Sequence, residues 1–489
     1  MAVYAAAVVA AALSAAAERT APGGLTFAAP FSDGAVLQAG KSVPVWGAGA
    51  KPGETVTVRF GRFSASAKAD GKGAWRAALP PMEASRESGV LEVSCGGATN
   101  SVGDVVVGEV WLCSGQSNMA QALVDPKLPR YRDGIGSMVA QTVRNPLLRH
   151  MVAPGKGGWH RFTPEYLSSG RRSAIAVHYA LEIYSHLEVP VGVVEASAGG
   201  SNIDAWQPND PKASCNARYM EGLYPYAMRG VLWYQGETNI YLGEVEEYGR
   251  KMHLLYDSWR ERFENPDLSF YYVQLAPFAR GNNVVHKSED GTTRVVDYDN
   301  RFPKFLCVQA AFEKEEPNAA MTVINDIGCI SDIHPNEKWL VAKRLALHAL
   351  KRNYGFAGVE DSSPTPRSAR ADGSRVVVSF DHAKSLYVYA RGKSFSDDLP
   401  PFELAGPDGA FKPARIENYR SRKWFESGAI DGDEIVLSAA GVSEPSAVRY
   451  AWNRPWTGVV YNDVDLPLGT FSMKVDGVSP KQGKSREQQ

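Results

Sequence analysis

The spacing of hydrophobic residues first indicates a β-rich region between residues 25 and 105. Hydrophobic and β-branched residues recur along short segments such as 42–46 and 55–60. Clusters of turn-forming residues at 51–54 and 70–73 separate these segments, as expected where a chain reverses between strands. The pattern predicts an N-terminal β-domain over 25–105, folded as a small sandwich.

The pattern changes near residue 106, where strands begin to alternate with helices. Hydrophobic runs that fit buried strands occur at 105–113, 191–194, 230–234, 270–273 and 321–324. Hydrophobic residues at helical spacing predict helices over 176–187, 245–263 and 339–350. This alternation is typical of an α/β fold with a parallel sheet and helices on both faces. We expect one such domain over 106–353.

Strand-like segments return in the last quarter of the chain. They lie at 376–380, 385–389 and 434–437, after a proline-containing stretch that begins at Ser362. We therefore expect a C-terminal β-domain over 360–476, sandwich-like in character. The polar, charged residues 480–489 are expected to form a disordered tail.

The N-terminus has a different composition from the rest of the chain. Residues 1–17 are almost entirely Ala, Val and Leu, and end in three alanines. An apolar segment that ends in small residues is typical of a secretory signal peptide. The Lys or Arg that usually precedes such a segment is missing here, and the alternative interpretation is an Ala-rich disordered tail. The signal reading predicts a periplasmic or secreted protein. No run of 18 apolar residues follows, so we expect no membrane span.

Composition and charge narrow the function classes. The chain has 489 residues, of which 44% are hydrophobic and 22% charged, which is ordinary for a globular protein. The formal net charge of −1 gives no basic surface for nucleic acid. Five cysteines without a closely spaced pair indicate neither a disulfide scaffold nor a zinc site.

Polar residues follow the predicted strands of the α/β region. They occupy 114–119, 196–201, 235–239 and 326–335. The carboxyl ends of parallel strands meet at one edge of a sheet, where ligands collect. Since core packing alone does not explain polar residues at all these ends, we expect the functional site there.

Ser117 and His334 are the candidate catalytic pair at this edge. Ser117 follows Gly115 on a predicted turn from strand to helix, although the same residues could be plain turn chemistry with Asn118 as a helix cap. A serine hydroxyl needs a base within hydrogen-bond reach. His334 lies in a loop after the last strand, whereas four other histidines lie on predicted helices, at 178, 186, 253 and 348.

The segments 108–119, 233–239 and 332–335 together resemble the sialate O-acetylesterase family of SGNH hydrolases. Residues 30–38 and 448–452 are also similar to that family, so the resemblance covers about 25–475. It implies an SGNH-type, flavodoxin-like parallel sheet and a serine carbohydrate esterase that needs no metal and no cofactor.

The resemblance implies roles for individual residues. Ser117 would be the nucleophile and His334 the general base. The oxyanion donors would be the N–H groups of Ser117 and Gly199 and the side-chain amide of Gln235. Glu237 and Asn239 would be supporting residues.

The residue that orients His334 stays open. The family commonly has an aspartate three residues before the histidine, where this chain has Ser331. Asp332, two residues before, is the first candidate. Asp326 and a backbone carbonyl are the alternatives.

The substrate expected from the resemblance is an O-acetylated glycan, with 9-O-acetyl sialic acid favoured and acetylxylan or another polysaccharide as the alternative. Ala198 and Asn202 depart from the family pattern, so the cleft wall differs. Candidate wall residues, each of which could equally be core, are Trp206, Trp233, Tyr234, Gln274 and Trp452; candidates for binding a sialic acid carboxylate are Arg229, Arg301 and Arg454. A glycan-binding protein with an inactive hydrolase core is the hypothesis from another class. The sequence does not give the oligomeric state.

Overall fold

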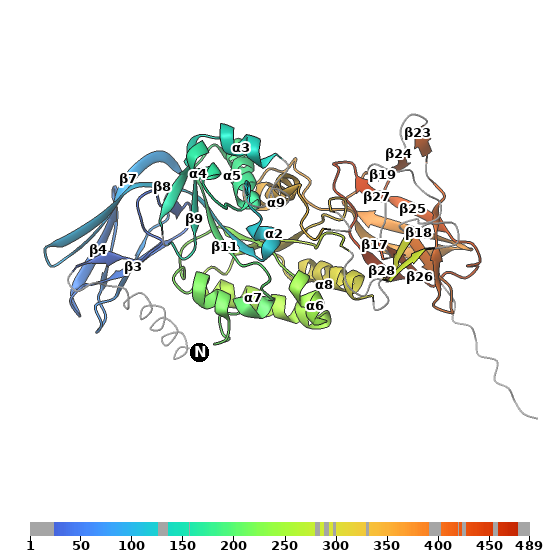
Figure 1. Ribbon diagram of the computed structural model, residues 1–489, viewed down its shortest axis with the longest axis horizontal. Helices are drawn as coiled ribbons and strands as arrows, with labels where there is room; N and C mark the ends of the chain where they lie inside the picture. The colour runs from blue at the N-terminus through green and yellow to red at the C-terminus, as the bar shows by residue number, and fades with distance from the viewer. Residues whose placement is uncertain are drawn as a thin grey trace, which may run out of the picture. The chain divides into compact units, whose positions relative to one another are not determined.

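The computed structural model describes two compact units, shown in Figure 1. The first comprises residues 1–273, 312–322 and 334–359, and the second comprises 274–311, 323–333 and 360–489. The residues described are 24–125, 135–155, 157–278, 284–287, 293–296, 300–328, 332–390, 402–418, 420–422, 427–452 and 458–477. The predicted signal peptide 1–17 and tail 480–489, together with Ser331 and Arg454, lie outside these residues.

The first unit begins with short antiparallel strands, as the sequence predicts. β1 (Thr26–Phe27), β3 (Val43–Ala48) and β6 (Trp75–Leu79) form one sheet. β4 (Thr55–Phe60) pairs with β5 (Phe63–Lys68) and β7 (Ser85–Cys95). Val56 and Val58 are fully buried while their neighbours face outward, because successive side chains of a strand point to opposite faces.

β8 (Ala98–Gly115) connects this region to the α/β region without a break. Its first part pairs antiparallel with β7, and its last residues pair parallel with β11 (Val191–Ser197) and β12 (Gly230–Tyr234). The boundary expected between residues 105 and 106 therefore falls inside one strand. The division of the chain into functional domains stays a prediction.

The central sheet has the parallel pairing that the sequence pattern predicts. Its strand order is β10-β9-β11-β8-β12-β13-β16, and only β10 runs antiparallel to its neighbour along this path. The remaining strands are β9 (Asn145–Val152), β10 (Trp159–Phe162), β13 (Ser269–Val273) and β16 (Ala319–Thr322), and β2 (Val36–Gln38) pairs parallel with β8. The carboxyl ends of the parallel strands thus share one edge.

Helices cover both faces of this sheet. On β13, Phe270 packs 5.4 Å from the ring of Tyr256 on α7 (Glu246–Arg262). The next residue, Tyr271, packs 5.4 Å from His348 on α9 (Lys338–Arg352), which lies beside α5 (Ala174–Leu187). Adjacent strand residues face opposite sides, so α7 covers one face and α5 with α9 the other. Shorter or peripheral helices are α2 (Ser117–Ala120), α3 (Gly136–Thr142), α4 (Pro164–Ser168), α6 (Glu237–Leu242) and α8 (Arg301–Glu315).

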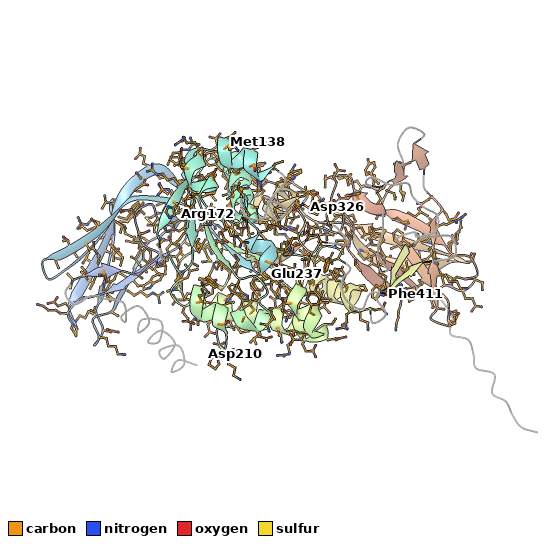
Figure 2. The ribbon with its side chains drawn as sticks, in the orientation of Figure 1. Met138, Arg172, Asp210, Glu237, Asp326 and Phe411 are labelled. Carbon is orange, nitrogen blue, oxygen red and sulfur yellow. The ribbon has the colours of Figure 1, made fainter. Side chains whose placement is uncertain are left out.

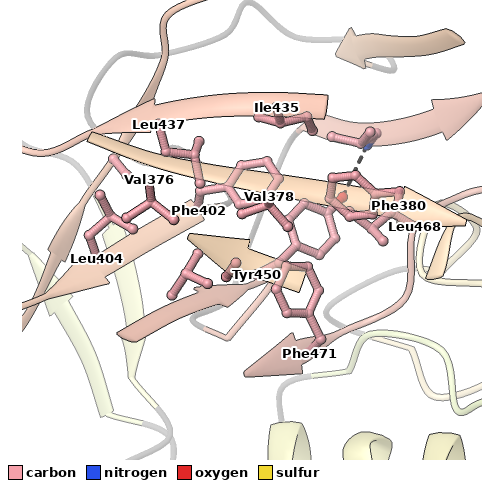
Figure 3. Close-up of a cluster of buried hydrophobic side chains, with 14 of the residues drawn as sticks. Val376, Val378, Phe380, Phe402, Leu404, Ile435, Leu437, Tyr450, Leu468 and Phe471 are labelled. Atoms are coloured by element: carbon pink, nitrogen blue, oxygen red, sulfur yellow. Dashed lines mark hydrogen bonds between the residues drawn. The ribbon is translucent and has the colours of Figure 1, made fainter. Parts of the chain in front are cut away.

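The second unit is mainly β. It contains three four-stranded sheets. The first has the strand order β17 (Thr365–Asp372), β18 (Arg375–Asp381), β25 (Glu434–Ser438) and β22 (Arg415–Ile416), and the second has the order β23 (Arg420–Arg422), β24 (Ser427–Asp431), β19 (Ser385–Ala390) and β27 (Gly458–Asn462). The third has the order β21 (Phe411–Pro413), β20 (Phe402–Ala405), β26 (Ala447–Tyr450) and β28 (Phe471–Lys474). β14 (Val284–Lys287) pairs with β15 (Thr293–Val296). Figure 3 shows the buried cluster between these sheets, in which Phe402, Tyr450 and Phe471 pack together.

Across the described ranges, the helices are too short or too polar to cross a membrane.

Candidate active site

A glycine-dependent turn places Ser117 at the carboxyl edge of the central sheet. Gly115 ends β8 with a φ of 135°, and a Cβ atom there would lie 2.1 Å from the carbonyl oxygen of Tyr234. Only glycine fits so close to a neighbouring strand. The N–H of Gln116 donates to that carbonyl at 3.0 Å, and Ser117 then begins α2. The strand end and the turn together fix the position of the serine.

His334 lies within hydrogen-bond distance of this serine. Its Nε2 is 2.9 Å from Ser117 Oγ, and its side chain is half-buried four residues before α9 begins. A base at this distance can take the hydroxyl proton as the serine attacks. The structure therefore brings together the two residues that the sequence selects as nucleophile and base.

Gly199 lies beside Ser117, just past the end of β11. A Cβ built on Gly199 would be 3.8 Å from Ser117 Cβ, and the N–H of Ala198 donates to the carbonyl of Gly115 at 3.0 Å. Within the residues that the structure describes, the N–H groups of Ser117 and Gly199 have no acceptor. Two backbone donors are thus available beside the serine.

Gln235 uses its side-chain amide inside the protein. Its Nε2 lies 3.1 Å from Gln116 Oε1, 3.1 Å from the Ser201 carbonyl and 2.7 Å from Asn239 Oδ1. Its Oε1 accepts from the hydroxyl of Tyr248 at 3.0 Å, and the side chain is fully buried. The oxyanion role of Gln235 stays a prediction, and in this geometry its donors are engaged elsewhere.

The residues after β12 hold the loop that carries Gly199. Gln235 donates to the carbonyl of Ser201, and Thr238 Oγ1 donates to that of Gly200 at 3.2 Å. Asn239 Oδ1 accepts the N–H of Ile203 at 3.1 Å, while its Nδ2 donates to Glu244. Two strand ends are thereby tied together, which limits the movement of the Gly199 N–H.

A buried chain of polar side chains lies next to Ser117. Asn118 Nδ2 donates to Glu237 Oε1, and Lys338 Nζ donates to Asn118 Oδ1 at 2.7 Å. Lys338 is fully buried, and Glu237 is nearly so. Glu237 is the first residue of α6 and is labelled in Figure 2. Burial raises the pKa of the Glu237 carboxyl above its usual value, against the opposing effects of the Asn118 amide and the Lys338 ammonium.

Sequence reasoning missed the structural roles of three residues at this site. Asn118 is not the helix cap considered above, because Gln116 occupies that position and makes no side-chain cap bond. Gln116 instead accepts from Gln235 and from the N–H groups of Gly236 and Thr238. All three residues contact partners that are far away in the sequence, so the sequence does not reveal these contacts. The position of Gln116 and Asn118 beside Ser117 was the one sequence feature that pointed to a role at this site, and Lys338 had none.

The two aspartates that are candidates for orienting His334, Asp326 and Asp332, lie in a different compact unit from the histidine. Both belong by contacts to the second unit, whereas His334 belongs to the first. Asp326 Oδ2 accepts from the hydroxyl of Tyr461 at 3.3 Å within that unit, and Asp332 is half-buried. The choice of the residue that orients His334 stays a prediction.

The expected aromatic wall is instead part of the core. Trp206, Trp233 and Tyr234 are at most 1% exposed, and Trp233 packs edge-on against Trp206 at 5.9 Å. Their reading as cleft walls is wrong, because strand-end position alone does not say which way a ring points. In the second unit, Gln274 is buried and donates to the Leu306 carbonyl, and Trp452 donates to Asn300.

Arg229 is also wrong as a candidate for binding a substrate carboxylate. Its Nε and Nη2 donate to both oxygens of Glu109, at 2.8 and 2.9 Å. Glu109 pairs with Val191 at the beginning of β11, so this ion pair lies at the amino ends of the strands, opposite Ser117. Arg301 begins α8 in the second unit.

Among the described residues, no three His, Cys, Asp or Glu side chains come together as a metal site would require.

Comparison with known proteins supports an esterase assignment. Residues 107–319 match the family described as carbohydrate esterase, sialic acid-specific acetylesterase. Human sialate O-acetylesterase is 30% identical over 408 residues, which cover 72% of this chain and 75% of the human protein. The sialate O-acetylesterase of the orangutan Pongo abelii is 29% identical over 407 residues, which cover the same shares of the two chains. A crystal structure of a carbohydrate acetylesterase from Xanthomonas citri is similar with a TM-score of 0.77 and 30% identity, over 92% of this chain and 99% of that one. The chain therefore belongs to the sialate O-acetylesterase family, whose members are carboxylic ester hydrolases.

Proposed function

We propose that this enzyme hydrolyses O-acetyl esters of sialic acid, with Ser117 as nucleophile and His334 as general base. As a family member it is a sugar O-acetyl esterase. The observation that carries the residue assignment is the 2.9 Å separation of His334 Nε2 and Ser117 Oγ. The relatives named sialate O-acetylesterase support sialic acid as the sugar.

In the first half of the reaction, Ser117 Oγ forms a bond to the acetyl carbonyl carbon while its proton passes to His334 Nε2. The carbonyl oxygen becomes an oxyanion, and the N–H groups of Ser117 and Gly199 donate to it. Loss of one such donor typically costs about 2.7–4 kcal/mol of transition-state stabilisation. The bond to the sugar oxygen then breaks, the imidazolium protonates that oxygen, and an acetyl-serine remains.

In the second half, His334 takes a proton from water, and the resulting hydroxide attacks the acetyl-serine carbonyl. The same donors stabilise the second oxyanion. Collapse of this intermediate releases acetate and returns the proton from His334 to Ser117 Oγ. Asp332 is our first choice to orient the imidazole, with Asp326 or a backbone carbonyl as the alternatives. Gln235 either donates to the oxyanion after exchanging partners or holds the Gly199 loop.

The same proposal covers the organisation of the chain. Residues 106–353 would form a flavodoxin-like SGNH catalytic domain, flanked by β-domains at 25–105 and 360–476. The apolar segment 1–17 would direct the protein to the periplasm or the exterior, where acetylated glycans are accessible.

Acetate release by the purified mature enzyme tests the substrate assignment. The substrates are an O-acetylated sialoglycan and acetylated xylan, with Ser117→Ala as the blank. We expect release mainly from the sialoglycan, and none from either substrate with the variant. The structural relative named only as a carbohydrate acetylesterase makes xylan the informative second substrate.

The other outcomes separate the alternatives. Release mainly from xylan would keep the mechanism and reject the sugar, and Ala198 and Asn202 would then be examined first. Release that persists in Ser117→Ala would reject the nucleophile. No release from either substrate by the wild type would favour the glycan-binding hypothesis.

A further inference from the structure

A second polar cluster adjoins the catalytic turn on the side of α5. Ser173, the N-cap of α5, donates its N–H to Glu195 Oε2 at 2.9 Å and its hydroxyl to Met119 Sδ at 3.7 Å. Glu195 also accepts from the hydroxyl of Ser197 at 3.1 Å. Met119 belongs to the helix that Ser117 begins, and Ser197 ends the strand that precedes Gly199. Ser173 therefore contacts both the helix that begins at Ser117 and the strand that precedes Gly199.

The residue before Ser173 is an arginine whose donors are only partly used. The Arg172 guanidinium lies over the ring of Tyr166, 4.1 Å from its centre (Figure 2 labels Arg172). Nη1 donates to the carbonyl of Arg171 at 3.1 Å. Nε is buried and has no hydrogen-bond acceptor, and Nη2 has none within the described part of the chain. Nε and Nη2 form one edge of the guanidinium, which is the edge that fits the two oxygens of a carboxylate.

The carboxylates nearby are committed to other groups. Glu195 pairs with His150 Nε2 at 3.0 Å, and Asp125 lies 3.5 Å from Arg171. Tyr166 is flanked by histidines: its hydroxyl is 2.7 Å from His150 Nδ1, and its ring stacks on His160. Among the described residues, none forms an ion pair with Arg172. An unpaired guanidinium donor gains free energy from an acceptor, so the Nη2 end of this edge is suited to an external anion, and the buried Nε can join the contact only after the side chain shifts.

The backbone of Arg172 is hydrogen-bonded to a residue that lies near Ser117 in the sequence. Its carbonyl accepts the N–H of Leu123 at 2.8 Å, and Leu123 lies six residues after Ser117. Six extended residues span at most about 20 Å, and the helical turn of α2 shortens this path. In sialic acid acetylated on its glycerol side chain, the ester and the carboxylate lie toward opposite ends of the molecule. A carboxylate subsite must therefore lie some way from Ser117, and the chain path sets an upper limit of about 20 Å on the distance between the Arg172 backbone and that serine.

We propose that Arg172 binds the carboxylate of an acidic sugar whose O-acetyl ester lies at Ser117. The inference rests on the proposed function and names the group that would select sialic acid over a neutral sugar. Arg172 is a binding residue in this account, and the acyl-transfer chemistry does not require it.

Kinetics on three esters test the assignment. The esters are O-acetylated sialic acid, the same sugar with its carboxylate as a methyl ester, and para-nitrophenyl acetate, which has no carboxylate. The variants are Arg172→Gln and Arg172→Lys. The matched control is the exposed neighbour, Arg171→Gln.

We expect Arg172→Gln to lower kcat/KM for the acidic sugar roughly 10- to 100-fold, mainly through KM, as loss of hydrogen bonds to a charged group predicts. Its activity on para-nitrophenyl acetate should equal that of the wild type, which shows that the variant is folded. The wild type should prefer the acid to its methyl ester, and Arg172→Gln should lose that preference. Arg172→Lys should recover part of the loss, because an ammonium keeps the charge but not the planar edge. Arg171→Gln should change nothing.

Several results would overturn the inference. One is equal cleavage of the acid and its methyl ester by the wild type; another is a similar loss on all three esters in Arg172→Gln. A wild type that cleaves acetylxylan and para-nitrophenyl acetate but not the acidic sugar would reject both the inference and sialic acid as substrate. An active, acid-selective wild type with an unaffected Arg172→Gln variant would reject the inference alone.

Discussion

Asn118 offers a direct test of how the turn that carries Ser117 is held in place. Its amide joins two buried ionisable groups, since it donates to Glu237 and accepts from Lys338 at 2.7 Å. Replacement by alanine removes both hydrogen bonds and leaves the carboxyl group and the ammonium group buried without the bridge. The substitution leaves the backbone N–H beside Ser117 in place.

The expected cost follows from these two bonds. A hydrogen bond to a charged group contributes about 1.5–3 kcal/mol, so their loss should lower the free energy of unfolding by about 3–6 kcal/mol. For a domain of this size, a loss of about 3 kcal/mol lowers the melting temperature by roughly 5 °C. Asn118→Asp should lose at least as much, because aspartate keeps an acceptor for Lys338 but places a carboxylate oxygen against the carboxylate of Glu237, to which it cannot donate.

Thermal unfolding by calorimetry or fluorescence measures this effect. The matched control is Asn209→Ala, which removes an exposed amide bonded to the hydroxyl of Ser258 at 3.2 Å and should shift the melting temperature by about 1 °C or less. An Asn118→Ala protein that melts with the control would refute the reasoning, since the bridge would then contribute nothing to stability.

Two further predictions concern the same edge of the sheet. Burial raises the pKa of the Glu237 carboxyl, so the folded protein holds the carboxyl proton more tightly than the unfolded chain does. The free energy of unfolding of the wild type therefore falls as the pH rises from the usual pKa of a glutamate through the raised one. The melting temperature of Glu237→Gln relative to wild type should therefore increase from pH 4 to pH 7, whereas a constant difference would contradict the raised pKa. Asn239→Ala frees the Ile203 N–H and loosens the Gly199 loop, so kcat on para-nitrophenyl acetate should fall about tenfold, equivalent to about 1.4 kcal/mol, with KM little changed. A rise in KM alone would show that the loop shapes binding rather than the transition state.

Local patterns predicted the parallel sheet and its polar edge because both follow from backbone geometry, and the resemblance to the esterase family then selected Ser117 and His334 as the candidate pair at that edge. Hydrophobic runs alternating with helical spacing imply parallel strands, and parallel strands end at one edge. Polar residues after separate strands must then meet there, which is how Ser117 and His334 come within 2.9 Å although 217 residues separate them.

Side-chain partners across the fold were not predictable in this way. Arg229 looked available until the structure placed it on Glu109, 120 residues earlier. Trp233 had the composition of a sugar platform, but the packing of α7 buries it 5.5 Å from Trp259. Lys338 gave no sequence signal of a buried role, because its partner Asn118 is brought to it only by the tertiary fold.

Covalent labelling of the nucleophile tests the central claim most directly. The purified enzyme is treated with a fluorophosphonate, which reacts with activated serines, and the labelled peptide is identified by mass spectrometry. The account predicts one label, on Ser117, that is absent in Ser117→Ala and forms far more slowly in His334→Ala. Labelling of another serine, or undiminished labelling of Ser117 without His334, would contradict it.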